Sequence, residues 1–420
     1  MRGVIWLVGL FVVAVVAATT LGSNDGLVSI YWGGWRTDFS LNLFVLALLG
    51  ACLVLMAAVR AFSSLLSLPK RAGAWRALRR ERAAQAALRE ALTEYFGARY
   101  GRARGAAQRA MLIAEEHEVL KADPEFRVLA GLLAAGSLHR LQDRPRRDAA
   151  LAQALRAAQG SSKGLRGGAR NTEEAVRLLA AEWALDDRDA PRAIETLDAM
   201  PPGAARRTHA LRLKLQALRM VRQPLDALQT ARLLAKHQAF SPLVAQALLR
   251  ALAGETLEGA HDVQQLRRLW GQFDAADRRD PQVVARAALR AVHLDAGEDA
   301  RQWLKPFWDR LSELSREDRE QVALALIEAR TGIGVDWLPR LEAAAQAHGH
   351  EAAVVAAVGM VFAERQLWGK ARLLLEQAAA APGLASRTRR AAWRQLAALA
   401  REEEDEARAL RCEQAAAALD

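Results

Sequence analysis

The sequence predicts an all-α protein, with two transmembrane helices followed by an α-solenoid of tetratricopeptide-like helix pairs. Three observations support this prediction. Residues 3–24 and 39–59 contain no charged side chain. The rest is dominated by Ala, Leu, Arg and Glu, which favour helix. Apolar residues there recur at helical spacing between short Gly, Pro or Asp breaks.

The first expected domain is a transmembrane hairpin anchor at residues 1–62. A bilayer core about 30 Å thick needs about 20 apolar residues in a helix, and Val4–Leu21 and Phe39–Val59 both qualify. The first segment alone resembles a signal peptide, but the second would hold the chain in the membrane even after cleavage. A buried helical hairpin within a soluble core is the alternative.

The distribution of basic residues predicts the orientation. The loop Asp25–Asp38 holds one base, Arg36, whereas a basic cluster follows the second segment. Basic residues resist translocation, so we expect a multi-pass membrane protein with both termini in the cytoplasm. The loop also carries three aromatic residues that would form an interfacial belt or pack on one another: Tyr31, Trp32 and Trp35.

The net charge of +11 is concentrated beside the anchor. Residues 70–109 carry 11 bases and 3 acids, whereas residues 110–420 carry 45 bases and 43 acids. This favours anionic lipid headgroups as the partner over nucleic acid, with a solvated helix face as the alternative. The second expected domain is therefore a basic juxtamembrane segment at residues 63–83. Its predicted membrane-surface contacts are Lys70, Arg71, Arg76, Arg79, Arg80 and Arg82.

The third expected domain, residues 84–420, is the solenoid. Its clearest helix pair is Ala353–Ala381, where small, aromatic and large residues take the positions of a tetratricopeptide repeat. Small residues would let the helices approach, and large ones would fill the groove between them. The expected packing residues are Gly359, Phe362, Trp368, Ala371, Leu375 and Ala378.

Other pairs are weaker, and an irregular helical bundle is the alternative. Two degenerate repeats are expected near Leu243–Ala276 and Glu317–Ala347. The corresponding small residue of the second helix is Ala103, Ala193, Ala227, Ala300 and, at the C-terminus, Ala407.

Motifs for chemistry are missing from the sequence. It contains no GxSxG, HExxH, GxxxxGK[ST], GxGxxG or CxxC pattern, so we expect no catalytic residue and no enzyme. Cys52 and Cys412 cannot build a disulfide framework or a cysteine-rich metal site. His348 and His350 share one turn and would at most assist a metal or haem iron, so no metal site is expected.

The N-terminal order of motifs resembles the HemY protein family of proteobacterial haem (protohaem IX) biosynthesis. The matching features are Trp6-Leu7-Val8, an R-x-D-x-S-L-N motif at Arg36–Asn42, and Leu68-Pro69 in the basic segment. The resemblance implies an inner-membrane protein associated with a late step of the pathway. A flavin-dependent protoporphyrinogen oxidase shares the name, but it needs a dinucleotide-binding glycine fingerprint near its start, where this chain has an apolar segment.

The main functional hypothesis is a scaffold that organises haem-pathway proteins by protein–protein interaction at the membrane. One alternative is a porphyrin- or haem-binding carrier, or an enzyme of that pathway. Another is an adaptor in envelope assembly. No cofactor is expected under the scaffold hypothesis, and the sequence leaves open which proteins dock and whether the chain self-associates.

Overall fold

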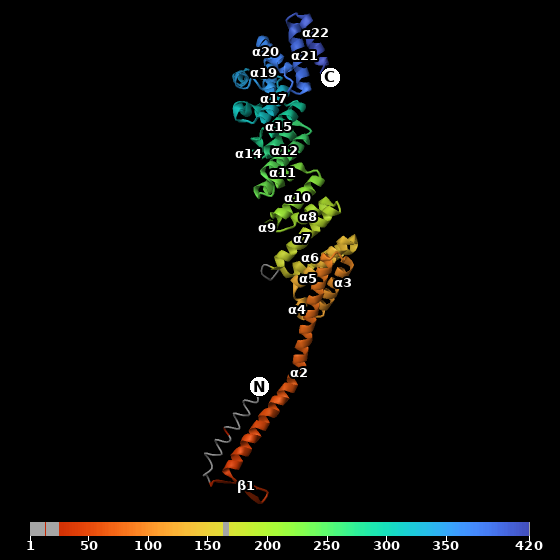
Figure 1. Cartoon of the computed structure of the whole chain (residues 1–420), viewed down its shortest axis with the longest axis vertical. Coiled ribbons are helices and arrows are strands. Elements are labelled where there is room, and N and C mark those ends of the chain that lie inside the picture. Colours follow the sequence, from red (N-terminus) through yellow and green to blue (C-terminus); the bar gives the residue numbers. More distant parts are fainter. Residues whose placement is uncertain (1–12, 14–24, 163–167, 420) are drawn as a thin grey trace. The chain divides into compact units, whose positions relative to one another are not determined.

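The computed structural model describes residue 13, residues 25–162 and residues 168–419 (Figure 1). Apart from residue 13, the predicted first membrane helix, Val4–Leu21, lies outside the described residues. The chain divides into two compact units, Met1–Ala169 and Arg170–Asp420. Helices account for nearly all regular structure in the described part, as the composition predicts.

The first unit begins with an antiparallel β-hairpin that the sequence analysis did not predict. Strand β1 (Leu27–Trp32) pairs with β2 (Trp35–Ser40), from Leu27 opposite Ser40 to Trp32 opposite Trp35. The two-residue turn is Gly33-Gly34, with φ of 58° and 86°. Two adjacent positive φ values suit the right-handed twist of a hairpin, and glycine adopts them without steric cost.

Helix α2 (Leu41–Phe96) follows the hairpin and runs unbroken through the second predicted membrane helix and the basic segment. The predicted domain boundaries after residues 62 and 83 both fall inside it. Its first part, Leu41–Phe62, has a mean hydropathy of 2.5, and none of it is buried against the rest of the chain. In the described residues this is the one helix long and apolar enough to cross a membrane.

The end of α2 packs in a small helical bundle through alanines. The bundle contains α3 (Tyr100–Glu115), α4 (Glu118–Lys121), α5 (Pro124–Arg140) and α6 (Arg144–Ser162). Ala84 and Ala91 of α2 are fully buried, as are Ala106 and Ala107 of α3. Alanine side chains let the helix backbones approach closely, and they are good helix formers.

The second unit is a succession of helix pairs (Figure 1). Its first half contains α7 (Gly168–Asp186), α8 (Ala190–Asp198), α9 (Pro202–Ala205), α10 (Thr208–Met220), α11 (Pro224–Lys236), α12 (Pro242–Glu258), α13 (Val263–Gln272) and α14 (Ala275–Arg278). Its second half contains α15 (Pro281–His293), α16 (Gly297–Trp308), α17 (Arg316–Glu328), α18 (Leu338–Ala347), α19 (Ala352–Glu364), α20 (Trp368–Ala380), α21 (Ser386–Glu402) and α22 (Glu406–Ala417). Short 3₁₀ turns lie at Leu311–Glu313 and Val335–Trp337.

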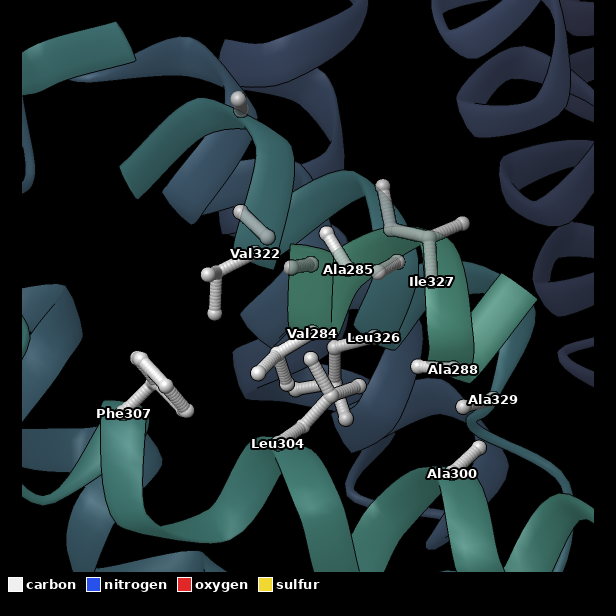
Figure 2. Packing of buried hydrophobic residues seen from close by; sticks show 14 of the residues in the cluster. Val284, Ala285, Ala288, Ala300, Leu304, Phe307, Val322, Leu326, Ile327 and Ala329 are labelled. Atoms are coloured by element: carbon white, nitrogen blue, oxygen red, sulfur yellow. The ribbon is translucent and has the colours of Figure 1, made fainter. Parts of the chain in front are cut away.

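Packing in this unit is between near neighbours along the chain. From α12 onward, the first helix of each pair contacts the first helix of the next, in the order α12, α15, α17, α19 and α21. Figure 2 shows Val284 of α15, Leu304 of α16 and Leu326 of α17 meeting in the interior, and all three are fully buried. Each predicted degenerate repeat contains a helix pair, α12–α13 in one and α17–α18 in the other.

The same turn recurs after the first helix of most pairs. One residue adopts positive φ, and the amide of the next residue donates to the carbonyl five positions earlier, as Asp189 does to Ala184 over 2.8 Å. Glycine usually takes this position, but none of these residues is glycine. They are Gln142, Arg188, Arg222, Asp295, Gln366 and Glu404.

Candidate membrane anchor and docking surfaces

The β-hairpin is tied to the start of the apolar helix by hydrogen bonds. The Ser40 hydroxyl accepts from the Leu43 amide over 3.3 Å and caps α2. The Leu41 amide donates to the Gly26 carbonyl over 2.8 Å, across the base of the hairpin. The hairpin base and the first turn of the apolar helix are therefore held together.

One face of the hairpin carries a polar network. The Arg36 guanidinium donates to Asp38 over 3.0 Å, and the Ser29 hydroxyl also donates to Asp38. These two hydrogen bonds hold the pKa of the Asp38 carboxyl below its ordinary value, and the one from Ser29 contributes more than the one from Arg36. The Arg36 guanidinium also lies 5.8 Å from the centre of the Tyr31 ring.

This network gives physical roles to the R-x-D-x-S-L-N motif. Arg36 and Asp38 pair across one strand face, and Ser40 caps the helix that follows. Sequence reasoning missed Ser29, which completes the network from β1. The Gly33-Gly34 turn between two β-prone runs is the signal that would have placed Ser29 opposite Asp38.

The predicted aromatic belt divides between the two hairpin faces. Tyr31, Trp32 and Trp35 are 72%, 85% and 81% exposed. Side chains alternate along a strand, so Trp32 and its register partner Trp35 share one face while Tyr31 lies on the other with Arg36. Whether the two tryptophans contact lipid stays a prediction.

The predicted membrane-surface residues all lie on α2. Arg76, Arg79, Arg80 and Arg82 are exposed, and Arg79 lies 5.4 Å from the centre of the Trp75 ring. The side chains of Lys70 and Arg71 lie outside the described part of the structure.

The distance of these basic residues from the apolar segment, measured along α2, limits their contact with lipid. At 1.5 Å per residue, Arg76 lies about 21 Å along the helix beyond Phe62, further than a Debye length of about 8 Å. Headgroup contact by Arg76 and the later bases therefore requires α2 to tilt or bend. Pro69, inside the helix, lacks the amide proton that would continue the backbone hydrogen bonds.

The six predicted packing residues meet in the α19–α20 pair. Ala371, Leu375 and Ala378 of α20 are fully buried, and Phe362 of α19 is 2% exposed. Trp368 is half-buried at the start of α20. A Cβ atom at Gly359 would lie 3.0 Å from the Leu375 side chain, so this position accepts only a small residue at the present helix separation.

The small residues predicted at the equivalent repeat position are buried in every pair except the last. Ala103, Ala193, Ala227 and Ala300 are fully buried. Ala407 is exposed on α22, and Ala409 is buried there instead. The helical period was therefore placed two residues too early in the last pair.

A groove lies between α10 and α12 of the second unit. One cavity of about 630 Å³ is lined by residues of α10 to α13, including Arg219, Arg222, Asp226 and Glu258. An adjoining cavity of about 610 Å³ shares Arg219 and Glu255 with it and adds Phe240 and Met220. We refer to the two cavities as the α10–α13 groove. Its lining mixes charged side chains with apolar ones such as Leu215, Leu225 and Phe240, so it suits a peptide segment that carries both kinds of side chain.

The histidine pair predicted as a weak metal candidate is held by hydrogen bonds and charge. His348 is 8% exposed, with Nδ1 3.3 Å from Glu351 and Nε2 3.3 Å from the Ser312 hydroxyl. Glu351 also accepts from Arg319 over 2.9 and 3.0 Å. Among the residues that the structure describes, no three His, Cys, Asp or Glu side chains gather as a metal ion would need.

The electrostatics of this cluster favour ionised Glu351. Burial by itself raises the pKa of the Glu351 carboxyl. The hydrogen bonds and charge of Arg319, with smaller contributions from His348, outweigh burial, so the pKa lies below the ordinary value of 4.5. Glu351 precedes α19 as its N-cap residue, and the cluster joins α17 to the start of α19.

Comparison with known proteins assigns the N-terminal region to a protein family. Residues 26–141 match the family model described as the HemY protein N-terminus. This region is the N-terminal domain of the HemY family. The match confirms the predicted family and supports an association with haem biosynthesis. The HemY N-terminal domain includes the hairpin, α2 and the bundle up to α5.

The remaining comparisons add little to the HemY match. No curated protein matches the chain at a significant level. Among solved structures, one described as "Structure of Naa15/Naa10 bound to HypK-THB" is 12% identical over 77% of this chain, with a TM-score of 0.24. The match spans 56% of that chain. A likeness at this level carries no conclusion about fold or function.

Proposed function

We propose that this protein is an inner-membrane-anchored tetratricopeptide scaffold associated with a late step of haem biosynthesis. The match of residues 26–141 to the HemY N-terminus is the observation that carries the proposal. In this role the chain would hold pathway enzymes close together, so that poorly soluble porphyrins pass between them at the membrane surface.

The anchor part of the proposal rests on Leu41–Phe62. This segment is long and apolar enough to cross a bilayer, and none of its residues is buried against the rest of the chain. With residues 4–21 as a second span, the protein is multi-pass and both termini are cytoplasmic. A reporter fused to the C-terminus should be active in the cytoplasm, and activity in the periplasm would contradict this topology.

The docking part rests on the helix pairs of the second unit. Their close packing through small residues such as Gly359 and Ala371 supports tetratricopeptide-like repeats, which stack into an α-solenoid that binds peptides or protein surfaces. Within this array we propose the α10–α13 groove as one docking surface for a partner segment.

The protein acts in this proposal without catalysing a reaction. It binds no haem, porphyrin or metal of its own, and its partners are haem-pathway proteins and membrane lipids. If purified protein shifted the Soret band of added porphyrin or haem, a carrier or enzyme role would replace the scaffold.

Proximity labelling from the C-terminus in cells tests the scaffold role. Haem-pathway proteins should be labelled, and loss of the protein should change cellular porphyrin levels. Labelling of envelope-assembly proteins alone, with porphyrin unchanged, would overturn the proposal in favour of an assembly adaptor.

A charge-reversal variant tests the docking surface within the same experiment. Arg219→Glu with Arg222→Glu should lower labelling of the docked partner while the protein remains folded and membrane-bound. Arg365→Glu with Arg394→Glu is the matched control, because both residues are exposed outside the groove. Equal labelling by both variants would exclude this groove as the docking surface.

A further inference from the structure

The β-hairpin separates its side chains into a polar face and an apolar face. Ser29, Tyr31, Arg36 and Asp38 alternate onto one face, where the polar network forms. The opposite face is apolar except for Thr37, whereas Leu27, at the base of the hairpin, lies on the polar face. The members of the apolar face are Val28, Ile30, Trp32, Trp35, Thr37 and Phe39.

The apolar face has no cover in the described structure. Trp32 and Trp35 are the most exposed hydrophobic residues on it, and Ile30 and Phe39 are 39% and 37% exposed. Val28 is half-buried. A two-stranded hairpin alone in water is marginally stable at best, so a surface that covers this face would stabilise it.

We propose that this apolar face lies in the lipid interface of the membrane leaflet where the helix Leu41–Phe62 begins. The hairpin would then be an amphipathic β-element parallel to the membrane plane, with the Arg36–Asp38 network facing water. This inference rests on the proposed membrane anchor and adds a second, defined contact with lipid.

Continuity with the apolar helix favours lipid over another occupant. Strand β2 passes directly into α2, and the Leu41–Gly26 hydrogen bond holds both strands at the first turn of the helix. If that helix spans the bilayer, the hairpin base must lie at its surface. Six residues of strand extend about 20 Å, so Trp32 and Trp35 reach lipid only if the hairpin lies flat.

The hydrogen-bonding needs of its backbone place the hairpin in the interfacial region and not in the hydrocarbon core. A two-stranded hairpin leaves the outer amide and carbonyl groups of both strands without a strand partner. The hydrocarbon core cannot satisfy such groups, whereas headgroups and interfacial water can. Tryptophan is also enriched at membrane–water interfaces, where an apolar ring with one polar N–H fits both environments.

Single-cysteine probes in the full-length protein test this inference in proteoliposomes. The background carries Cys52→Ala and Cys412→Ala. Thr37→Cys and Ile30→Cys place an environment-sensitive fluorophore on the apolar face, and Tyr31→Cys places it on the polar face as the matched control. Quenching is measured with iodide in water and with lipids spin-labelled near the headgroup.

The two faces should respond in opposite ways. Probes at positions 37 and 30 should show several-fold weaker iodide quenching than the probe at position 31, together with clear quenching by the spin-labelled lipid. Equal iodide quenching on both faces would overturn the inference. So would shielding of positions 37 and 30 in native membranes but not in pure lipid, since a protein would then cover the face.

A further probe separates this inference from the anchor proposal. Cys52 is exposed in the apolar segment and is labelled in a variant carrying only Cys412→Ala. Lipids spin-labelled deep in the acyl chain should quench it. If Cys52 is quenched while position 37 is open to iodide, the hairpin inference alone fails. If Cys52 is also open to iodide, the anchor fails.

Discussion

Two apolar helical segments of this protein have opposite surroundings. No residue of Leu41–Phe62 in α2 is buried, whereas every residue from Ala353 to Ala363 in α19 is buried. At 1.5 Å per residue the first spans about 33 Å, enough for a bilayer core, and the 13 residues of α19 span only about 20 Å. Both segments are apolar. Their length and their neighbouring helices determine whether each one suits a bilayer or a protein interior.

The N-terminal caps of the two helices differ in the same sense. Ser40 caps α2 beside an exposed hairpin, through a single short side chain. Before α19, Glu351 is bound by Arg319 and His348 and is 7% exposed. The first helix begins at a surface that we propose to be lipid, and the second begins inside protein.

Introducing a charge should give the largest difference in unfolding free energy between α19 and the apolar part of α2. Val358→Asp in α19 places an unpaired carboxylate at a fully buried position, and we expect a loss of about 4 kcal/mol or more in the free energy of unfolding. Val54→Asp in α2, where Val54 is 70% exposed, should leave that free energy unchanged in detergent. Urea unfolding followed by circular dichroism measures both variants, and similar losses would contradict the comparison.

The Glu351 cluster gives the next largest effect and a pH dependence. Because the pKa of Glu351 is lowered on folding, its ionised form stabilises the protein fully above about 4.5, and this contribution is lost as the pH falls through the folded-state pKa. Glu351→Gln should cost about 2 kcal/mol at pH 7 through weakened hydrogen bonds to Arg319.

The difference between Glu351→Gln and the wild type should shrink below pH 4.5. Thermal unfolding across pH 3.5–7 measures it, and a difference that stays constant over this range would exclude the proposed charge effect. The control is Glu342→Gln, whose carboxylate pairs with Lys370 at an exposed site and should have little effect at any pH.

Helix approach in the α19 pair gives a smaller effect. Gly359→Ala introduces a Cβ atom 3.0 Å from the Leu375 side chain, and overpacking of this kind costs about 1–3 kcal/mol, partly offset by better helix propensity. Gly369→Ala in α20 meets no atom within 4 Å and should be neutral or slightly stabilising. Chemical unfolding of both variants tests this, and equal effects would show that Gly359 is not a close-packing position.

The turn after α19 gives the smallest expected effect. Gln366 has a φ of 58°, which a residue with a Cβ atom adopts at a cost of about 1 kcal/mol. Gln366→Gly should therefore raise the free energy of unfolding by about 0.5 kcal/mol, after the entropy cost of glycine. Gln377→Gly inside α20 should instead destabilise, and stabilisation by both would indicate an effect unrelated to the turn.

Sequence periodicity predicted much of the fold because helix pairs repeat a simple physical pattern. The apolar period located the α12–α13, α17–α18 and α19–α20 pairs, and the buried alanines marked where helices approach. The turns were harder to predict, since Gln142, Arg188 and Gln366 adopt a conformation that sequence patterns associate with glycine. Their conformation follows from the packing of the helices that they join.

The candidate site was predicted in composition but not in geometry. Tyr31, Trp32 and Trp35 were grouped by their position in one loop, and only strand alternation separates Tyr31 from the two tryptophans. Ser29 can be placed opposite Asp38 only once the Gly33-Gly34 turn is interpreted as a two-residue hairpin turn. His348 suggested a metal ligand by residue type, whereas its surroundings depend on Arg319, which is remote in the sequence.

Alkaline carbonate extraction of the full-length protein tests the central claim most directly. Membranes from cells that express the wild type should retain the protein after washing. A paired Val54→Asp and Leu49→Asp variant should be extracted in part, since each charge at the bilayer centre costs about 2.5–3.5 kcal/mol. Complete release of the intact wild-type protein by carbonate would contradict a membrane-spanning Leu41–Phe62.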